Sequence, residues 1–170
     1  MPSSYSPPQP IDCSMVNISS LAESFAKALN YSPGDLLDPI VTRLHGNIVY
    51  LPLSAKESKQ ASITVEEGGE FVIRLFSPLF PLQERMSIAH ELGHLFLHSR
   101  LGEIAIEASH DDNNENRLAE NQAQRFARAF LMPSVKVQEM LAAGSDSLGI
   151  AAAFMVPEPV ARQRIAEISG

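Results

Sequence analysis

Two histidines and a glutamate stand close together in the segment His90-Glu91-Leu92-Gly93-His94, an H-E-x-x-H pattern. On an α-helix, residues four apart lie about 40° apart around the axis and one turn apart along it, so His90 and His94 can bind one metal ion. Glu91 lies about 100° round from His90, where its carboxylate can reach a water molecule rather than the ion. A metal that acidifies water, beside a carboxylate that moves the proton, is the chemistry of amide hydrolysis.

The residues around the motif decide between a metal site and an accidental pattern. H-E-x-x-H arises by chance in about one chain in a hundred of this length and composition. Apolar side chains flank the motif on most sides, which indicates a buried helix. Polar groups in an apolar interior need a partner, and a shared metal ion supplies one. The apolar flanking residues are Ile88, Ala89, Leu92, Leu95, Phe96 and Leu97.

Length, charge and cysteine content restrict the class of protein. A chain of 170 residues is long enough for one compact domain with a sizeable core. Its formal net charge of −7 opposes non-specific binding to nucleic acid and to anionic membranes. The single cysteine, Cys13, excludes an internal disulfide and fits a reducing compartment. The first ten residues lack the features of a signal peptide, and no apolar run is long enough to span a bilayer. We therefore expect a cytoplasmic protein.

The segment before the motif predicts an α+β fold with a small, mostly antiparallel sheet of about three strands. Ser20 and Glu23 have the spacing of a capping box, which predicts the start of a helix. Alternating apolar residues on either side of a Glu-Gly-Gly-Glu turn indicate a β-hairpin. The expected elements are a helix over 20–30, a short helix over 40–45, a strand over 47–53 and a hairpin around 67–70.

After the sheet, the sequence predicts an all-helical remainder interrupted by one polar loop. The motif helix is expected over 82–100, the loop over 102–114, and a second long helix over 115–132, ended by Pro133. Three shorter helical pieces follow, separated at Gly144 and around Pro157. We expect three divisions of the chain: a disordered Pro/Ser tail over 1–17, a core over 18–133 and a C-terminal helical extension over 134–170.

A catalytic zinc site typically has three protein ligands, so the motif histidines need a third. His98 lies about 12 Å along the helix axis from His90, too far to share the ion in the same way. We expect His98 to pack on the core or to shield the site. The three-histidine version of the motif needs glycine at 97 and histidine at 100, where this chain has Leu97 and Arg100.

Glu120 is the predicted third ligand. It lies on the apolar stripe of the second long helix, three residues before Ala123 and seven before Ala127, and an acid on a buried face needs a cation. His110 is the alternative ligand. A further possibility is that Glu120 forms an ion pair at the helix surface with Arg117, Arg125 or Arg128.

Two stretches of the sequence together carry a family pattern. Residues 85–98 contain the H-E-x-x-H motif, and residues 120–133 are similar to the pattern E-x-x-A-x-x-F-A-x-x-L-L-M-P. A weaker similarity extends over 149–165. On these residues the chain resembles the ImmA/IrrE family of zinc metallopeptidases, small regulatory proteases of bacteria and their mobile elements. One departure is Gln124, which stands where asparagine is common in the family.

The resemblance implies roles for four residues and a class of substrate. By the family pattern, His90, His94 and Glu120 hold the zinc. Glu91 is the general base. The implied partner is a helix-turn-helix repressor of the XRE type, whose cleavage releases mobile-element or stress genes. The residue that stabilises the oxyanion stays open among Tyr50, His98 and His110.

The C-terminal helices raise the possibility of direct DNA binding. Residues 147–168 have helix-turn-helix spacing, but Met155 occupies the tight-turn position where glycine is expected. Residues 134–170 carry three basic and four acidic side chains, a net charge of −1, which gives no phosphate-binding footprint. We expect this pair to pack on the core or to dock a substrate, with no direct binding of nucleic acid and no membrane contact.

Two functional hypotheses from different classes remain. The first is a zinc endopeptidase that acts on one or a few proteins. The second is a toxin-like, partner-binding protein of a toxin–antitoxin pair, in which the zinc is structural or vestigial. Glu91 favours the first hypothesis, because a purely structural zinc site has no need of a general base.

Overall fold

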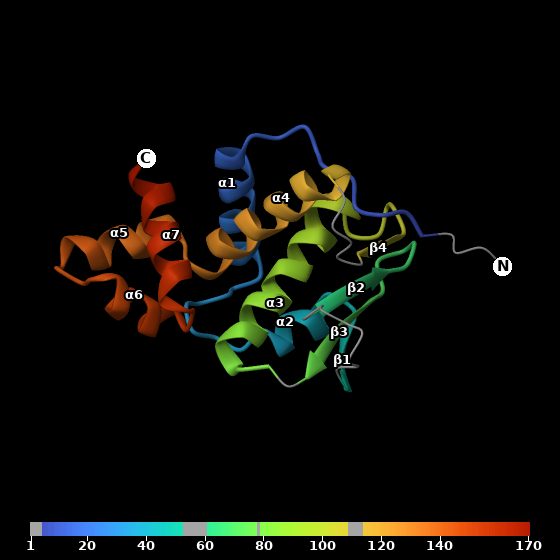
Figure 1. Cartoon of the computed structure of the whole chain (residues 1–170), viewed down its shortest axis with the longest axis horizontal. Coiled ribbons are helices and arrows are strands. Elements are labelled where there is room, and N and C mark those ends of the chain that lie inside the picture. Colours follow the sequence, from blue (N-terminus) through green and yellow to red (C-terminus); the bar gives the residue numbers. More distant parts are fainter. Residues whose placement is uncertain (1–4, 53–60, 78, 109–113) are drawn as a thin grey trace.

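The chain folds into a four-stranded sheet packed with helices. The computed structural model describes residues 5–52, 61–77, 79–108 and 114–170. In Figure 1, α3 runs between the sheet and α4, and α5–α7 gather at the end of the molecule away from β4. The helices are α1 (Met15–Ala28), α2 (Asp38–Arg43), α3 (Pro81–Gly93), α4 (Asn114–Leu131), α5 (Ser134–Ala142), α6 (Ser147–Phe154) and α7 (Glu158–Ser169). The strands are β1 (Gly46–Pro52), β2 (Ala61–Val65), β3 (Phe71–Ser77) and β4 (Ile106–Ala108).

The sheet has the strand order β1-β3-β2-β4. β2 and β3 form the predicted antiparallel hairpin, whose turn uses backbone with positive φ at Gly68 and Gly69. Glycine adopts this conformation at no steric cost, which is why the turn can be so tight. The predicted α+β class, a small sheet packed with helices, is confirmed.

Two features of the sheet differ from the prediction. β1 pairs in parallel with β3, so the sheet is mixed. β4, which pairs antiparallel with β2, lies inside the segment that was predicted to be a loop over 102–114. In β4 only Ile106 and Ala108 are buried, on either side of the exposed Glu107. Three residues give too short an alternation to be recognised in a sequence, and the pairing partner of a strand depends on contacts far along the chain.

The N-terminal segment is more ordered than predicted. Ser6 forms a β-bridge with Ile106, so the chain already lies against the sheet there. α1 begins at Met15, where the Ser14 hydroxyl accepts a hydrogen bond from the backbone of Asn17. The predicted capping box at Ser20 is therefore wrong, and the expected tail over 1–17 does not extend through Met15–Asn17, which are helical. Residues 1–4 lie outside the described part of the chain.

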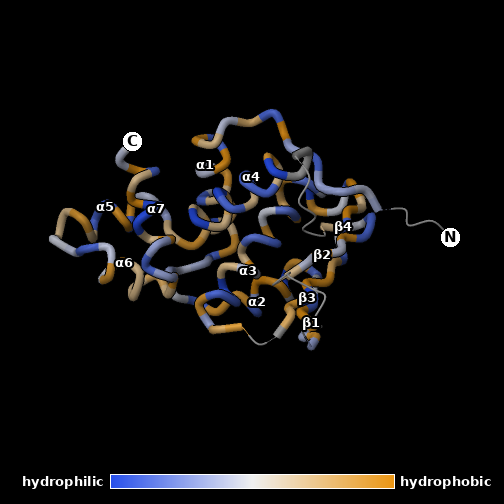
Figure 2. Tube along the Cα trace, viewed as in Figure 1, coloured by the Kyte–Doolittle hydropathy of each residue, from blue (hydrophilic) through white to orange (hydrophobic). Residues whose placement is uncertain are grey.

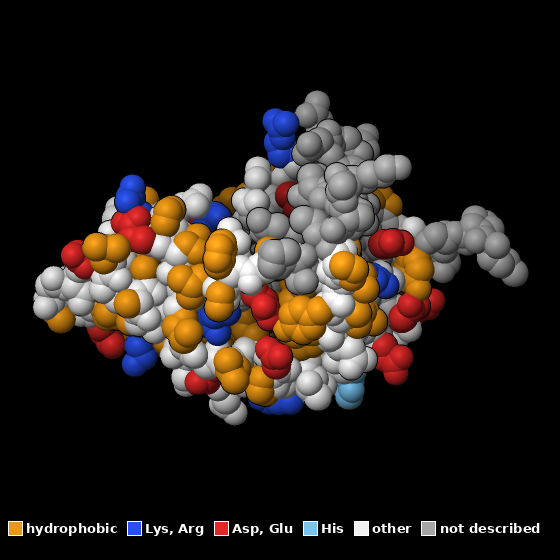
Figure 3. Space-filling view, turned by 60° about the horizontal axis from the view of Figure 1, so that its bottom comes forward, with side chains coloured by type: hydrophobic (Ala, Val, Ile, Leu, Met, Phe, Trp, Pro, Cys, Tyr) orange, Lys and Arg blue, Asp and Glu red, His pale blue; other side chains and the backbone are white. Residues whose placement is uncertain are grey.

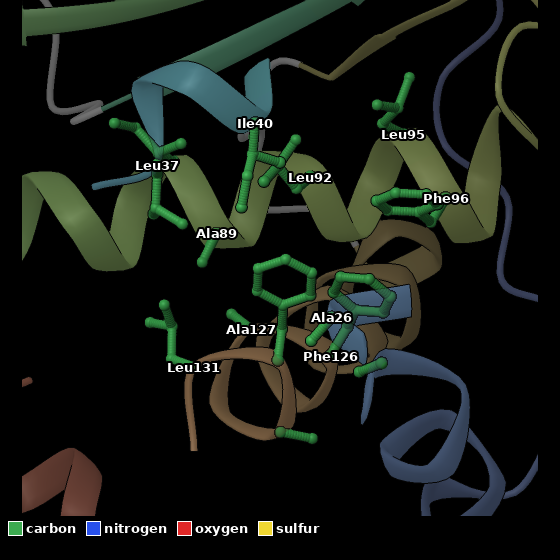
Figure 4. Packing of buried hydrophobic residues seen from close by; sticks show 14 of the residues in the cluster. Ala26, Leu37, Ile40, Ala89, Leu92, Leu95, Phe96, Phe126, Ala127 and Leu131 are labelled. Carbon is green, nitrogen blue, oxygen red and sulfur yellow. The ribbon is translucent and has the colours of Figure 1, made fainter. Parts of the chain in front are cut away.

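Part of the core lies where α1, α3 and α4 meet. Figure 4 shows Phe96 of the motif helix on the side toward Phe126 of α4, and both residues belong to the buried core. The Phe96 and Phe126 rings stack with their centroids 5.4 Å apart, and aromatic pairs of this kind add to the stability gained from burial. These contacts hold the two helices that carry the predicted metal ligands in one fixed arrangement.

Apolar and polar residues alternate along the elements. Figure 2 shows this alternation along the whole tube, with no element that is hydrophobic throughout. Among the described helices, none is long and apolar enough to cross a membrane.

A buried arginine of α3 joins the C-terminal helices to the core. Arg85 is 8% exposed and donates to three acceptors, two in the loop between α1 and α2 and one between α6 and α7. Its Nε donates to the carbonyl of Met155 at 3.1 Å, its Nη1 to the carbonyl of Asp35 at 2.7 Å, and its Nη2 to the Tyr31 hydroxyl at 2.7 Å. Met155 has a φ of 55°, so the turn between α6 and α7 is tight although its residue is not glycine. The predicted boundary between a core over 18–133 and a C-terminal extension over 134–170 stays a prediction.

Candidate metal centre

The three predicted ligands come together in the structure. His90 lies in the last turn of α3, His94 follows directly after this helix, and Glu120 lies in the first half of α4. Nε2 of His90 is 2.7 Å from Glu120 Oε2, and Nε2 of His94 is 3.0 Å from Glu120 Oε1. One ligand atom from each residue lies within 4.8 Å of the other two. The geometry therefore allows all three to hold one ion, while their role as ligands stays a prediction.

The cluster is buried on one side and reachable on the other. His94 is fully buried, whereas the side chains of His90 and Glu120 are 14% and 23% exposed. A substrate can approach only from the partly exposed side. This asymmetry is what a catalytic site needs, because a structural zinc site is closed by protein ligands all round.

Glu91 lies next to the cluster in the interior. Glu91 is fully buried and lies on the helical turn between His90 and His94. Burial lowers the pKa of His94, while the negative charges of Glu120 and Glu91 act in the opposite direction. The charge of Glu91 thus acts on His94, while the role of Glu91 as general base stays a prediction.

The motif helix changes its winding at the second histidine. The predicted helix over 82–100 is α-helical only to Gly93 and continues as a π-helical turn over His94–His98, in which the Ser99 N–H donates to the His94 carbonyl at 3.0 Å. Left-handed backbone at Arg100 and Leu101 then ends it. Such π-turns are frequent at functional sites, and nothing in the sequence pattern signals this one.

His98 lies directly behind His94. Nδ1 of one ring is 2.8 Å from Nδ1 of the other, and His98 is 3% exposed. Burial lowers the pKa of His98 to about 4, so the ring is neutral near pH 7. Nδ1 and Nε2 lie on opposite sides of the His94 ring, and His98 therefore stands on the side away from Glu120.

Gln122 is a member of this cluster that sequence reasoning missed. Its Oε1 lies 3.0 Å from His98 Nε2, and its amide also bonds to the backbone of Ile11. Helical spacing puts Gln122 about 200° round from Glu120, away from the predicted ligand face. Ile11 was expected to be part of a disordered tail. No sequence signal therefore connected the two residues to the site.

Gly93, inside the motif, allows α3 and α4 to approach closely. A Cβ atom at this position would lie 2.9 Å from the carbonyl oxygen of Ala123 and 3.0 Å from its Cα. Real Cβ atoms essentially never come so close to backbone atoms, so the helices could not pack in this way with alanine at 93. Ala123 is one turn from Glu120, and the close approach brings the Glu120 carboxylate to the histidines.

The other candidate contacts lie elsewhere. Arg128 pairs with Glu167 at 2.6 Å and Arg125 contacts the same carboxylate at 3.5 Å, whereas Glu120 contacts the histidines. The Tyr50 hydroxyl donates to a carboxylate oxygen of Glu84 at 2.6 Å, near the start of α3. His110, the alternative ligand, lies outside the described residues.

The donor atoms suit a zinc ion. Two imidazole nitrogens and one carboxylate oxygen are a ligand set found in catalytic zinc sites of hydrolases. His94 is fully buried, with Nε2 facing a carboxylate oxygen at 3.0 Å, and a cation between them would satisfy both groups. The residues present therefore fit the metal that the sequence implied.

Comparison with known proteins identifies the family. Residues 42–166 match the family model of the IrrE N-terminal-like domain, the Peptidase M78 family. This match covers most of the chain, so the protein belongs to that family. Family membership indicates a metallopeptidase-like domain. No relative was found among curated proteins.

A solved structure supports the fold. The chain is similar to a Mycobacterium tuberculosis transcriptional regulator, with a TM-score of 0.62 and 16% sequence identity. The similarity covers 88% of this chain and 55% of the regulator, so the chain spans about half the length of that protein. At this level of identity the comparison shows a shared fold only.

Proposed function

We propose that the protein is a cytoplasmic, zinc-dependent endopeptidase that cleaves a helix-turn-helix transcriptional repressor. The observation that carries the proposal is the convergence of His90, His94 and Glu120 beside the buried Glu91. The family match supports a peptidase, and the single cysteine supports a reducing compartment. In this proposal residues 18–133 form the catalytic core, and residues 134–170 are an extension packed on it.

The side chains divide the work of hydrolysis between them. His90, His94 and Glu120 hold the zinc, which when bound acidifies water and polarises a peptide carbonyl. Glu91 accepts the proton of the attacking water as the new carbon–oxygen bond forms. It then gives that proton to the amine that leaves when the carbon–nitrogen bond breaks. The exposed edges of His90 and Glu120 face the side from which the peptide enters.

The proposed substrate class rests on family resemblance and on charge. The resemblance to the ImmA/IrrE family implies an XRE-type repressor as the substrate, and the sequence has 13 Lys and Arg against 20 Asp and Glu. Figure 3 shows acidic and basic side chains interspersed over one face, with hydrophobic groups between them. The net charge of −7 points the same way. The protein would thus act on the repressor rather than on DNA.

The second candidate is a toxin-like protein that binds an antitoxin and holds zinc for structure alone. The buried carboxylate of Glu91 favours the protease, because burying an acid that has no chemical task costs stability. In a structural site the cluster would also be expected to be closed to solvent, whereas two of its side chains are partly exposed.

The test is cleavage of a purified XRE-type repressor encoded beside the gene. We expect zinc-loaded protein to cut it into discrete fragments, and Glu91→Gln to cut it about 10³-fold more slowly, because general acid–base catalysis contributes 10²- to 10⁴-fold. Glu91→Gln should bind zinc as tightly as the unmodified chain. Repressor binding without cleavage, and equal cellular effects of both forms, would favour the toxin-like alternative.

A further inference from the structure

A chain of buried hydrogen bonds runs from the rear of His94 to the backbone of Ile11. It passes from His94 Nδ1 to His98 Nδ1 at 2.8 Å, and from His98 Nε2 to Gln122 Oε1 at 3.0 Å. The three side chains are at most 3% exposed. Hydrogen atoms in such a chain cannot be placed freely, because each bond needs one donor and one acceptor.

The backbone of Ile11 sets the orientation of the Gln122 amide. The Ile11 N–H donates to Oε1 at 3.0 Å, and Gln122 Nε2 donates to the Ile11 carbonyl at 2.8 Å. A reversed amide would place two donors together and two acceptors together. The oxygen of Gln122 is therefore the atom that faces His98. An amide oxygen only accepts, so the proton of this contact belongs to His98 Nε2.

The proton on His98 Nε2 determines which nitrogen of His94 carries a proton. A neutral imidazole carries a single N–H, and the two ring nitrogens of the buried His98 contact another imidazole and an amide rather than a carboxylate. With its proton on Nε2, His98 presents a lone pair at Nδ1. The contact of 2.8 Å then requires His94 Nδ1 to donate. His94 therefore carries its lone pair on Nε2, the atom that faces Glu120 Oε1 at 3.0 Å, and a cation between these two acceptors would satisfy both.

We infer that His98 and Gln122 are positioning residues that hold His94 in the tautomer able to bind a metal through Nε2. The inference rests on the proposed ligand set and deepens it. A ligating histidine is commonly held by a hydrogen bond from its other nitrogen to a carboxylate or a carbonyl. Here the partner is a second imidazole, and the tautomer is set by the backbone of Ile11, which lies 111 residues before Gln122 in the chain.

The tautomers can be measured directly in the whole, zinc-loaded chain. Long-range ¹H–¹⁵N correlation spectra of the histidine rings show which nitrogen carries the proton. We expect His94 to be protonated on Nδ1 and His98 on Nε2 near pH 7. Protonation of His98 on Nδ1, or exchange of either ring between its two tautomers, would overturn the inference. This readout needs no variant and no activity.

Two variants of His98 separate positioning from packing. In His98→Asn the amide oxygen can take the place of Nδ1 and still accept from His94. In His98→Leu a side chain of similar size leaves no acceptor there. We expect His98→Leu to bind zinc 10- to 100-fold more weakly than the unmodified chain, and His98→Asn to bind within about threefold. Equal affinity of the two variants would contradict the inference, as would a similar loss in both.

Different experimental results would contradict the positioning role of His98 and the proposed protease function. If zinc binds and His94→Ala abolishes binding, while His98→Leu binds normally, the metal site stands and the positioning role falls. If the chain binds zinc and shows the expected tautomers but cleaves nothing, the positioning role stands and the protease proposal falls. If no zinc binds at all, the ligand set falls and the inference falls with it.

Discussion

Two clusters of polar side chains lie near the two ends of α3. They differ in how the free-energy cost of burying polar atoms is compensated. Near the start of the helix, three nitrogens of Arg85 donate hydrogen bonds. The acceptors are the carbonyls of Met155 and Asp35 and the hydroxyl of Tyr31. Around His90 and His94, at its end, nitrogen and oxygen atoms converge on one another instead, and these atoms are all potential metal ligands. The first cluster is complete as a structure. The second becomes complete when a cation is added.

The difference gives a physical criterion for separating structural from functional polar groups. Donors matched to acceptors indicate a role in stability, because each buried group is compensated within the protein. Nitrogen and oxygen atoms of several side chains that converge on one point, and could all bind one cation, indicate a binding site instead. On this criterion Arg85 links segments of the fold, and Glu120 is a candidate metal ligand.

The largest expected difference between the clusters is in zinc affinity. Glu120→Ala should weaken zinc binding by more than about 100-fold, because the loss of a direct ligand should exceed the 10- to 100-fold effects seen for groups behind the ligands. Arg85→Met should leave affinity within about threefold, measured by competition with a chelator under conditions where both variants are folded. Equal effects of the two changes would remove the distinction drawn between the clusters.

Stability should show the reverse order. Arg85→Met leaves the buried Tyr31 hydroxyl and two backbone carbonyls in part-buried hydrogen bonds without their donor, and we expect the free energy of unfolding to fall by about 3 kcal/mol in urea titrations of metal-free protein. Glu120→Ala should lower that free energy less than Arg85→Met does, because the Glu120 carboxylate is 23% exposed and water can reach part of it. Lys136→Met, on the exposed side of α5, serves as the control and should change little. A larger loss from Glu120→Ala than from Arg85→Met would contradict the comparison.

Gly93→Ala should affect stability and zinc together, because this position sets the spacing of the two ligand helices. Forcing a Cβ against the Ala123 backbone should cost about 2 kcal/mol and move Glu120 away from the histidines, lowering zinc affinity. The matched control is Gly149→Ala in α6, where the added Cβ meets its nearest atom at 3.4 Å and helix propensity favours alanine. If Gly93→Ala lowered stability alone, the spacing of the helices would not be what positions the ligand.

The smallest expected effect is the response of metal-free protein to mild acid. Burial lowers the pKa of His98 to about 4 in the folded state, below the ordinary value of 6.5 that it regains on unfolding. The unfolded chain therefore binds the proton first, and stability falls as the pH drops below about 6.5. Between pH 7 and pH 5.5 this should amount to about 1 kcal/mol, with His94 acting in the same direction. His98→Asn should flatten the profile, and an unchanged profile would show that another group is responsible.

Much of the site could be predicted because it depends on local patterns. The periodicity of apolar residues located both ligand helices, and the position of Glu120 on the apolar face of α4 singled it out as the third ligand. The hairpin of β2 and β3 followed from alternation around two glycines. Each of these signals lies within one element, where side-chain direction follows from backbone geometry.

What could not be predicted depends on contacts between distant segments. The π-turn at His94 and the Gln122–Ile11 contact leave no periodic trace, since a single hydrogen-bond shift or a single buried amide has no repeat. β4 was missed for a similar reason, because its three residues are a strand only by pairing with β2. Ser14 caps α1 and Ser20 lies inside the helix, a choice between two serines that local propensity alone does not reveal.

The most direct test is a crystal structure of the zinc-loaded chain with an anomalous difference map recorded at the zinc absorption edge. The account predicts one peak per chain, bound by Nε2 of His90, Nε2 of His94 and a carboxylate oxygen of Glu120, at the usual zinc distances of about 2.0 to 2.2 Å. It also predicts a position open to solvent beside Glu91. A peak at other residues, or zinc enclosed by a fourth protein ligand, would contradict the assignment of a catalytic metal centre.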